Sequence, residues 1–136
     1  TGWYTLSLHD ALPILESLED ADVAIAGAGI AFLELGGLPT REQLDRLAVS
    51  LQSHLGQSAD KAEEALILGR WLVTESGGAA PGLERLTRRL LKLRGAASFQ
   101  PLMAVLKDVA ATARDGKVSA RQSEALGEIA VLYRIS

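Results

Sequence analysis

The stretch DVAIAGAGIAFLELGG, residues 22–37, decides the fold. If its apolar residues formed a strand, that strand would lead into a glycine-rich turn. A second apolar strand would then be expected further along the chain. The next segment, TREQLDRLAVSLQSHL at 40–55, is instead polar, with leucines at helical intervals. We therefore expect a tightly packed helix from about Glu16 to Glu34, whose small residues let a neighbouring helix approach closely: Ala24, Ala26, Gly27 and Gly29.

The glycines of this stretch leave one enzymatic alternative open. They resemble the opening of a flavin- or nicotinamide-binding unit, where a strand leads into a G-x-G-x-x-G turn at a helix N-terminus. Gly27 and Gly29 match the first two glycines, but Phe32 takes the third position, where close packing of helix and strand needs glycine. A dinucleotide-binding enzyme fragment with a degenerate motif over 27–32 stays an alternative.

Composition favours an all-α fold. The 136-residue chain is 48% hydrophobic but only 4% aromatic, so Leu, Ala, Val and Ile must build the core, and the β-forming residues come singly. Because it has no cysteine, the chain has no disulfide, no thiolate nucleophile and no Cys-ligated zinc. No apolar run approaches the roughly 20 residues of a membrane span, which predicts a soluble, cytoplasmic protein.

The first 14 residues are expected to carry no function. TLSLHDALPI at 5–14 resembles one translated reading frame of a widely used sequencing adapter, and the chain begins at Thr1 without a methionine. We therefore expect residues 1–14 to be non-native and residues 15–136 to form a single domain. The alternative is a natural helical arm in which His9 and Asp10 are solvated.

Cap and turn residues predict five helices after the first. Thr40 with Gln43, and Ser119 with Gln122, have the spacing of a capping box and predict the starts of the second and sixth helices. Between them we expect a third helix from Ser58 or Asp60, a loop at 76–82, a fourth helix at 83–94 and a fifth from Ser98 to Asp115. The third helix carries Trp71 as its large apolar anchor.

The two capping-box junctions also align with each other. GGLPTREQLDRL at 36–47 matches DGKVSARQSEAL at 115–126 in its glycine, cap, glutamine and leucine positions. Each junction follows an apolar helix, so the pattern predicts a helix hairpin repeated about 79 residues apart. Two similar hairpins, with helices between them, make a compact bundle of six visible helices.

Residues 102–136 resemble the second hairpin of the TerB-like domains, which are named for tellurite resistance. The family's hallmark is an acidic DG turn followed by a V-S-x-x-E-type helix cap, matched here by Asp115, Gly116, Val118 and Ser119. The resemblance covers about 115 residues of the chain. It implies an all-α domain of about seven helices, truncated here at its C-terminus, that acts as a non-catalytic binding or scaffold module in a stress response.

The resemblance also implies an acidic surface that binds a divalent cation such as Ca²⁺, Mg²⁺ or Mn²⁺. Such a cation needs several converging oxygen ligands. The candidate ligands are Asp115, Glu124, Glu34 and Asp45. The set is incomplete, because Gly36 stands where the second turn has Asp115, and Gln122 replaces the family's usual glutamate. The alternative is that Asp115 is a turn residue accepting amide hydrogen bonds and that Glu124 is solvated.

Charge is divided unevenly along the chain. Residues 15–64 hold three basic and ten acidic side chains, whereas residues 65–136 hold eleven basic and six acidic ones. The segment LERLTRRLLKLRG at 83–95 is a basic amphipathic helix, and its candidate partner-binding residues are Arg85, Arg88, Arg89 and Lys92. It predicts either a solvated face that complements the acidic half or an adaptor to an anionic membrane or nucleic acid. The net charge of −3 and the lack of interleaved aromatic residues disfavour nucleic acid.

Candidate catalytic residues are scarce. Outside residues 1–14 the single histidine is His54, and no nucleophile motif lies near it in the sequence. We therefore expect a protein that is not an enzyme and that binds a protein partner, with peripheral membrane contact as a further possibility.

Overall fold

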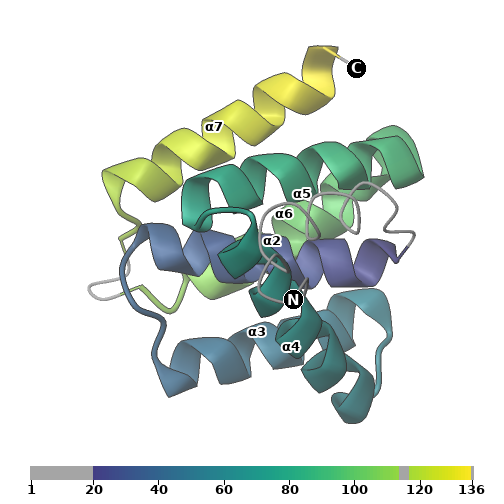
Figure 1. Cartoon of the computed structure of the whole chain (residues 1–136), viewed down its shortest axis with the longest axis vertical. Coiled ribbons are helices and arrows are strands. Elements are labelled where there is room, and N and C mark those ends of the chain that lie inside the picture. Colours follow the sequence, from purple (N-terminus) through teal and green to yellow (C-terminus); the bar gives the residue numbers. More distant parts are fainter. Residues whose placement is uncertain (1–19, 114–116, 136) are drawn as a thin grey trace, which may run out of the picture.

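The computed structural model describes residues 20–113 and 117–135, which are helical and contain no strand. The helices are α2 (Ala21–Leu35), α3 (Arg41–Leu55), α4 (Ala59–Glu75), α5 (Ala79–Arg94), α6 (Phe99–Ala110) and α7 (Ala120–Ile135), with the short 3₁₀ helix η2 (Gly95–Ser98) before α6 (Figure 1). The all-α prediction is confirmed for these ranges. The expectations for residues 1–14 and for Asp115 lie outside them.

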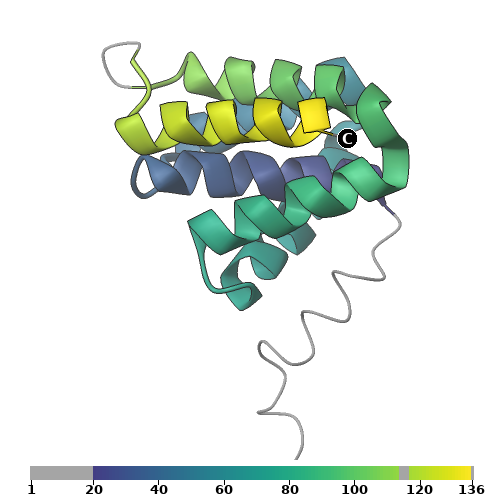
Figure 2. The same ribbon diagram turned by 90° about the horizontal axis from the view of Figure 1, so that it is seen from above.

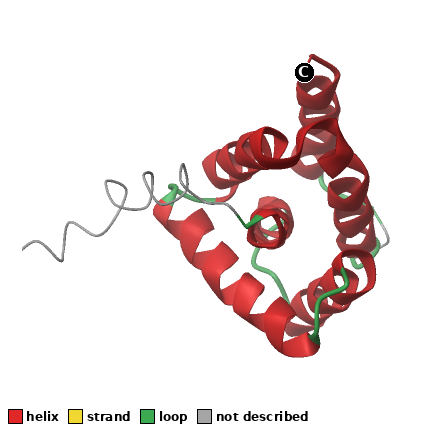
Figure 3. Ribbon diagram, turned by 90° about the vertical axis from the view of Figure 1, so that its right-hand side faces the viewer, coloured by secondary structure: helices red, strands yellow, loops and turns green. Residues whose placement is uncertain are grey.

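Helix α2 lies at the centre of the fold. Every residue from Val23 to Leu33 is buried, so water reaches no side of this apolar helix. It packs against α3, α4, α5, α6 and α7, and Figure 3 shows the other helices arranged around one helix seen end-on. Because residues 21–35 form one continuous helix, Gly27 and Gly29 are not part of a strand–turn–helix unit.

Glycines on α2 and α4 allow these helices to approach at backbone distance. A Cβ added to Gly69 would lie 2.7 Å from the backbone nitrogen of Gly27 and 2.8 Å from its Cα. A Cβ on Gly27 would meet Leu86 Cδ1 at 2.7 Å, and one on Gly29 would meet Leu47 Cδ1 at 2.7 Å. The expectation that small residues of α2 serve close packing is confirmed.

Both predicted capping boxes are present. Thr40 Oγ1 accepts from the Gln43 amide at 3.1 Å, and Gln43 Oε1 accepts from the Thr40 amide at 3.0 Å. Ser119 and Gln122 make the same pair of bonds, at 3.1 and 2.9 Å. Since each box satisfies two amides that a helix start leaves unpaired, the boxes fix where α3 and α7 begin.

Several expectations about helix ends and anchors are wrong, among them that of the fifth helix, α6, which ends at Ala110 and does not reach Asp115. The helix that we expect from about Glu16 to Glu34 is α2, which begins at Ala21, because Asp20 is an extended N-cap whose carboxylate accepts from the Asp22 and Val23 amides. Helix α5 begins at Ala79, inside the expected loop, since Pro81 falls in the first turn, where an amide is not needed. Trp71 is exposed and does not anchor α4 in the core.

We predict that Gly69→Ala destabilises the fold by about 3 kcal/mol, because the new Cβ meets backbone atoms that move only if two helices separate. Gly27→Ala should cost less, since the nearest atom is a flexible leucine methyl group. Gly127→Ala is the matched control: space around it is open, and replacing a helical glycine should stabilise by about 0.5–1 kcal/mol. Urea unfolding of the three variants checks this order, and equal effects at positions 69 and 127 would contradict it.

Candidate functional site

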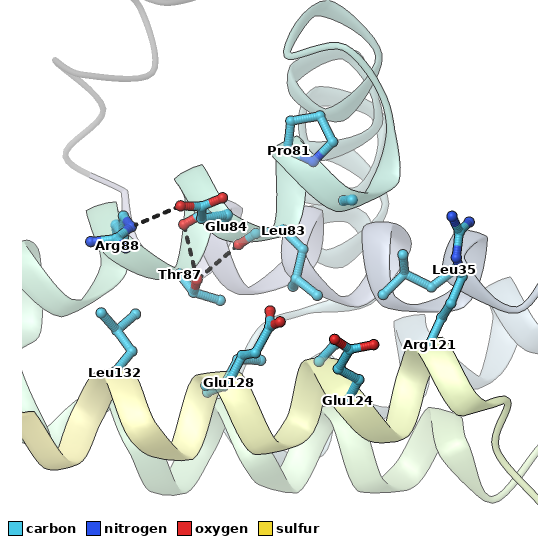
Figure 4. A pocket seen from close by; sticks show the side chains of 13 residues that line it. Leu35, Pro81, Leu83, Glu84, Thr87, Arg88, Arg121, Glu124, Glu128 and Leu132 are labelled. Atoms are coloured by element: carbon cyan, nitrogen blue, oxygen red, sulfur yellow. Dashed lines mark hydrogen bonds and ion pairs between the residues drawn. The ribbon is translucent and has the colours of Figure 1, made fainter.

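A groove of about 720 Å³ runs between α5 and α7, with the end of α2 beside it (Figure 4). Its apolar lining comes from all three helices: Leu35, Ala80, Pro81, Leu83, Ala125, Ile129 and Leu132. Leu83 and Thr87 point from α5 towards α7. A concave apolar surface edged by a few polar groups is the usual form of a binding site.

The rim of the groove carries charges of both signs. On α5, Glu84 Oε1 and Arg88 Nε lie 3.3 Å apart and form an ion pair. On α7, Glu124 and Glu128 point towards the groove, while Arg121 lies near its Leu35 end (Figure 4). Because Glu84 and Arg88 neutralise each other, the rim as a whole is slightly acidic, and its negative charge lies on α7.

Helix α7 is fastened near both of its ends, and between them Ala125 and Ile129 line the groove, although they are only 7% and 3% exposed. Near its start, Gln122 Nε2 donates to the Phe32 carbonyl of α2 at 2.9 Å in a buried position. Near its end, the Tyr133 and Ser98 hydroxyls are 2.6 Å apart, and the Tyr133 ring lies 5.2 Å from that of Phe99. Burial raises the pKa of the Tyr133 hydroxyl from its ordinary value of 10.0, against the opposing effect of the hydrogen bond with Ser98. Figure 2 shows α7 running alongside its neighbours between these points.

The four candidate partner-binding residues of α5 do not form one free basic surface. Arg85 Nη1 donates to the Ser76 carbonyl at 2.9 Å and so holds the turn between α4 and α5. Arg88 pairs with Glu84 and lines the groove. Arg89 is half-buried, and Lys92 is exposed. The segment is thus a basic helix whose arginines serve partly in structural contacts.

The candidate metal ligands are not brought together. Asp45 lies on the exposed side of α3, with Oδ1 3.6 Å from Arg41 Nε. Glu34 lies in the last turn of α2, and Glu124 lines the α5–α7 groove. Within residues 20–113 and 117–135, no three His, Cys, Asp or Glu side chains gather to hold a metal ion.

A polar cluster that the sequence did not predict joins α3 to α6. Ser50 Oγ donates to Asp108 Oδ2 at 2.7 Å, and His54 Nε2 lies 2.9 Å from the same oxygen. Burial acts to raise the pKa of Asp108, yet that pKa lies below its ordinary value of 3.8, because Ser50 and His54 bond to the carboxylate and Arg46 adds positive charge. A catalytic triad needs histidine between serine and aspartate. Here the aspartate is in the middle, so His54 is not placed to activate Ser50.

Comparison with known proteins assigns no relative. No family model matches the chain, and neither a curated protein nor a solved structure matches it significantly. Within the described ranges, none of the helices has the length and apolar character needed to cross a bilayer.

We predict that Gln122→Glu destabilises the fold by about 2 kcal/mol. A carboxylate keeps the capping box but cannot donate to the Phe32 carbonyl, and it places two oxygens against each other in a buried site. Gln43→Glu is the matched control, because the Gln43 side chain bonds to the Thr40 amide within its own capping box, and it should change stability by less than about 0.5 kcal/mol. Thermal melting compares the pair; equal losses would show that the bond to Phe32 contributes nothing.

We predict that Asp108 stabilises the fold above about pH 4 and not in strong acid. A carboxylate with a lowered folded pKa contributes stability above its unfolded pKa of 3.8, and this contribution is lost as pH falls through the folded pKa. Asp108→Asn should lower the free energy of unfolding by about 1 kcal/mol at about pH 6 and by almost nothing at about pH 2. The expected loss is small because water screens the partly exposed carboxylate. Urea unfolding across this range tests it, with exposed Asp45→Asn as control. A difference that grows in acid would contradict the assignment.

Proposed function

We propose that the chain is a non-catalytic binding module whose α5–α7 groove takes an apolar segment of a protein partner. The observation that carries this proposal is the groove itself, in which seven apolar residues from three helices line a concave surface. Arg85 and Arg88 of α5 already bond to groups within the protein. This supports a protein partner over a membrane or nucleic acid, which would need these arginines to be available for phosphate groups.

The groove chemistry suggests what the partner segment must offer. Leu83 of α5 and Ile129 of α7 both line the groove, so the segment needs apolar side chains repeated along its length. The rim holds the ion pair of Glu84 with Arg88 and further charges on α7, so polar side chains at the edges of the segment are accommodated. An amphipathic helix meets both conditions, since it presents one apolar stripe between polar flanks.

We also propose that the chain is a TerB-like domain that serves in a tellurite-type stress response in the cytoplasm. The support is the pair of capping boxes, Thr40 with Gln43 and Ser119 with Gln122, at the two aligned junctions. In this proposal the bundle is built from two similar hairpins, and a complete domain has about seven helices. Cation binding remains a prediction that depends on Asp115, which lies outside the described residues.

The groove proposal predicts where a model partner binds. An amphipathic helical peptide of leucine and glutamine, about 18 residues or roughly five turns long, serves as an uncharged probe in ¹H–¹⁵N correlation spectra. We expect shifts concentrated on α5 and α7, with a Kd in the range of about 1–100 µM. Leu132→Arg should abolish these shifts. Val131→Arg, the neighbouring exposed position outside the groove, should leave them unchanged. Shifts that survive Leu132→Arg would refute the groove as the binding site.

A further inference from the structure

The α4 outer face, which consists of Asp60, Glu63, Glu64, Ile67, Leu68 and Trp71, presents large apolar side chains to solvent. Ile67 is 67% exposed, Leu68 40% and Trp71 36%. Ile67 and Trp71 are four residues apart and so share one side of the helix, with Leu68 beside them. The buried residues of α4 lie on its other side, because Gly69, Leu72 and Val73 pack into the core. Apolar side chains gathered on one exposed helix face are typical of an interaction surface.

The same face is acidic towards the start of the helix. Asp60, Glu63 and Glu64 are all exposed and precede Ile67 by one to two turns. Lys61 is a weak counter-charge, because its Nζ lies 4.0 Å from Glu64 Oε2 and both side chains are more than 70% exposed. The α4 outer face therefore has a negative end and an apolar end.

Charge and burial exclude several occupants. Three clustered carboxylates repel the phosphates of nucleic acid and of anionic lipids. The basic α5 of a second copy has the opposite charge, but its leucines at 83, 86 and 90 are buried in their own core and cannot cover Trp71. Residues 1–19 of the same chain contain Asp10, Glu16 and Glu19 and no lysine or arginine, so their charge does not complement the face.

We propose that the α4 outer face docks an amphipathic helix of a partner protein, in which an apolar stripe is continued by lysines or arginines. The stripe covers Ile67, Leu68 and Trp71, while the basic end pairs with Glu63 and Glu64. Tryptophan is among the residues that most often dominate binding energy in interfaces, which fits the exposed position of Trp71. No α4 residue lines the α5–α7 groove, so this surface is independent of the proposed function.

The fluorescence of Trp71 tests the proposal directly. Trp3 is the chain's other tryptophan, so the full chain with Trp3→Phe has Trp71 as its single reporter. The probe is an amphipathic helical peptide of leucine and lysine, about 18 residues or roughly five turns long. We expect it to shift the Trp71 emission to the blue in a saturable way, with a Kd in the range of about 1–100 µM. The same peptide with glutamate in place of lysine should give no shift.

Matched charge reversals locate the contact. The double variant Glu63→Lys/Glu64→Lys should bind the leucine–lysine peptide at least about tenfold more weakly. Glu42→Lys/Asp45→Lys makes the same change in net charge on exposed positions of α3 and should have little effect. Circular dichroism confirms that each variant is folded.

Four results would overturn the proposal: no emission shift with the leucine–lysine peptide, equal responses to both peptides, a concentration-dependent blue shift of the protein alone, or a blue shift on phosphatidylserine vesicles. The third result would assign the face to a second copy of the chain, and the fourth to a membrane.

Discussion

The structure depends on the complete burial of α2. A helix that is apolar on every side needs neighbours on every side, and α3, α4, α5, α6 and α7 supply them. Where α2 crosses α4, such crowding depends on glycine. A Cβ on Gly69 would lie 2.7 Å from the Gly27 backbone nitrogen, and a Cβ on Gly27 would lie 3.3 Å from the Gly69 backbone. The crossing of α2 with α4 thus sets the spacing around which the other helices pack.

The second constraint is a single buried amide. Gln122 caps its own helix with Oε1 and donates with Nε2 to the Phe32 carbonyl, so it joins the start of α7 to α2. A glutamine can do both because it carries an acceptor and a donor at once. Together with the contact between Tyr133 and Ser98, this bond holds α7 near its two ends, and the groove against α5 lies between them.

Local chemistry made much of the fold predictable, and tertiary packing explains what was missed. The all-α class and both capping boxes follow from residues close together in the sequence. The exposure of Trp71 does not follow from local sequence. Gly69 contacts α2, so Trp71, two residues later in the helix, lies on the opposite, exposed side of α4. In the Asp108 cluster, Asp108 bonds to His54 and Ser50, which precede it in the sequence by 54 and 58 positions. The groove depends on how α5 and α7 are spaced. Neither leaves a signal in the sequence, although the apolar positions 125, 129 and 132 follow a helical period.

Native-state hydrogen exchange tests whether α2 is the core on which the other helices depend. Amides that exchange only when the whole protein unfolds share the global free energy of unfolding. We expect the amides of residues 25–33 to belong to this class, and those of α7, beside the groove, to exchange through smaller openings. Exchange of the α2 amides that is faster than that of α5 or α7 would contradict it.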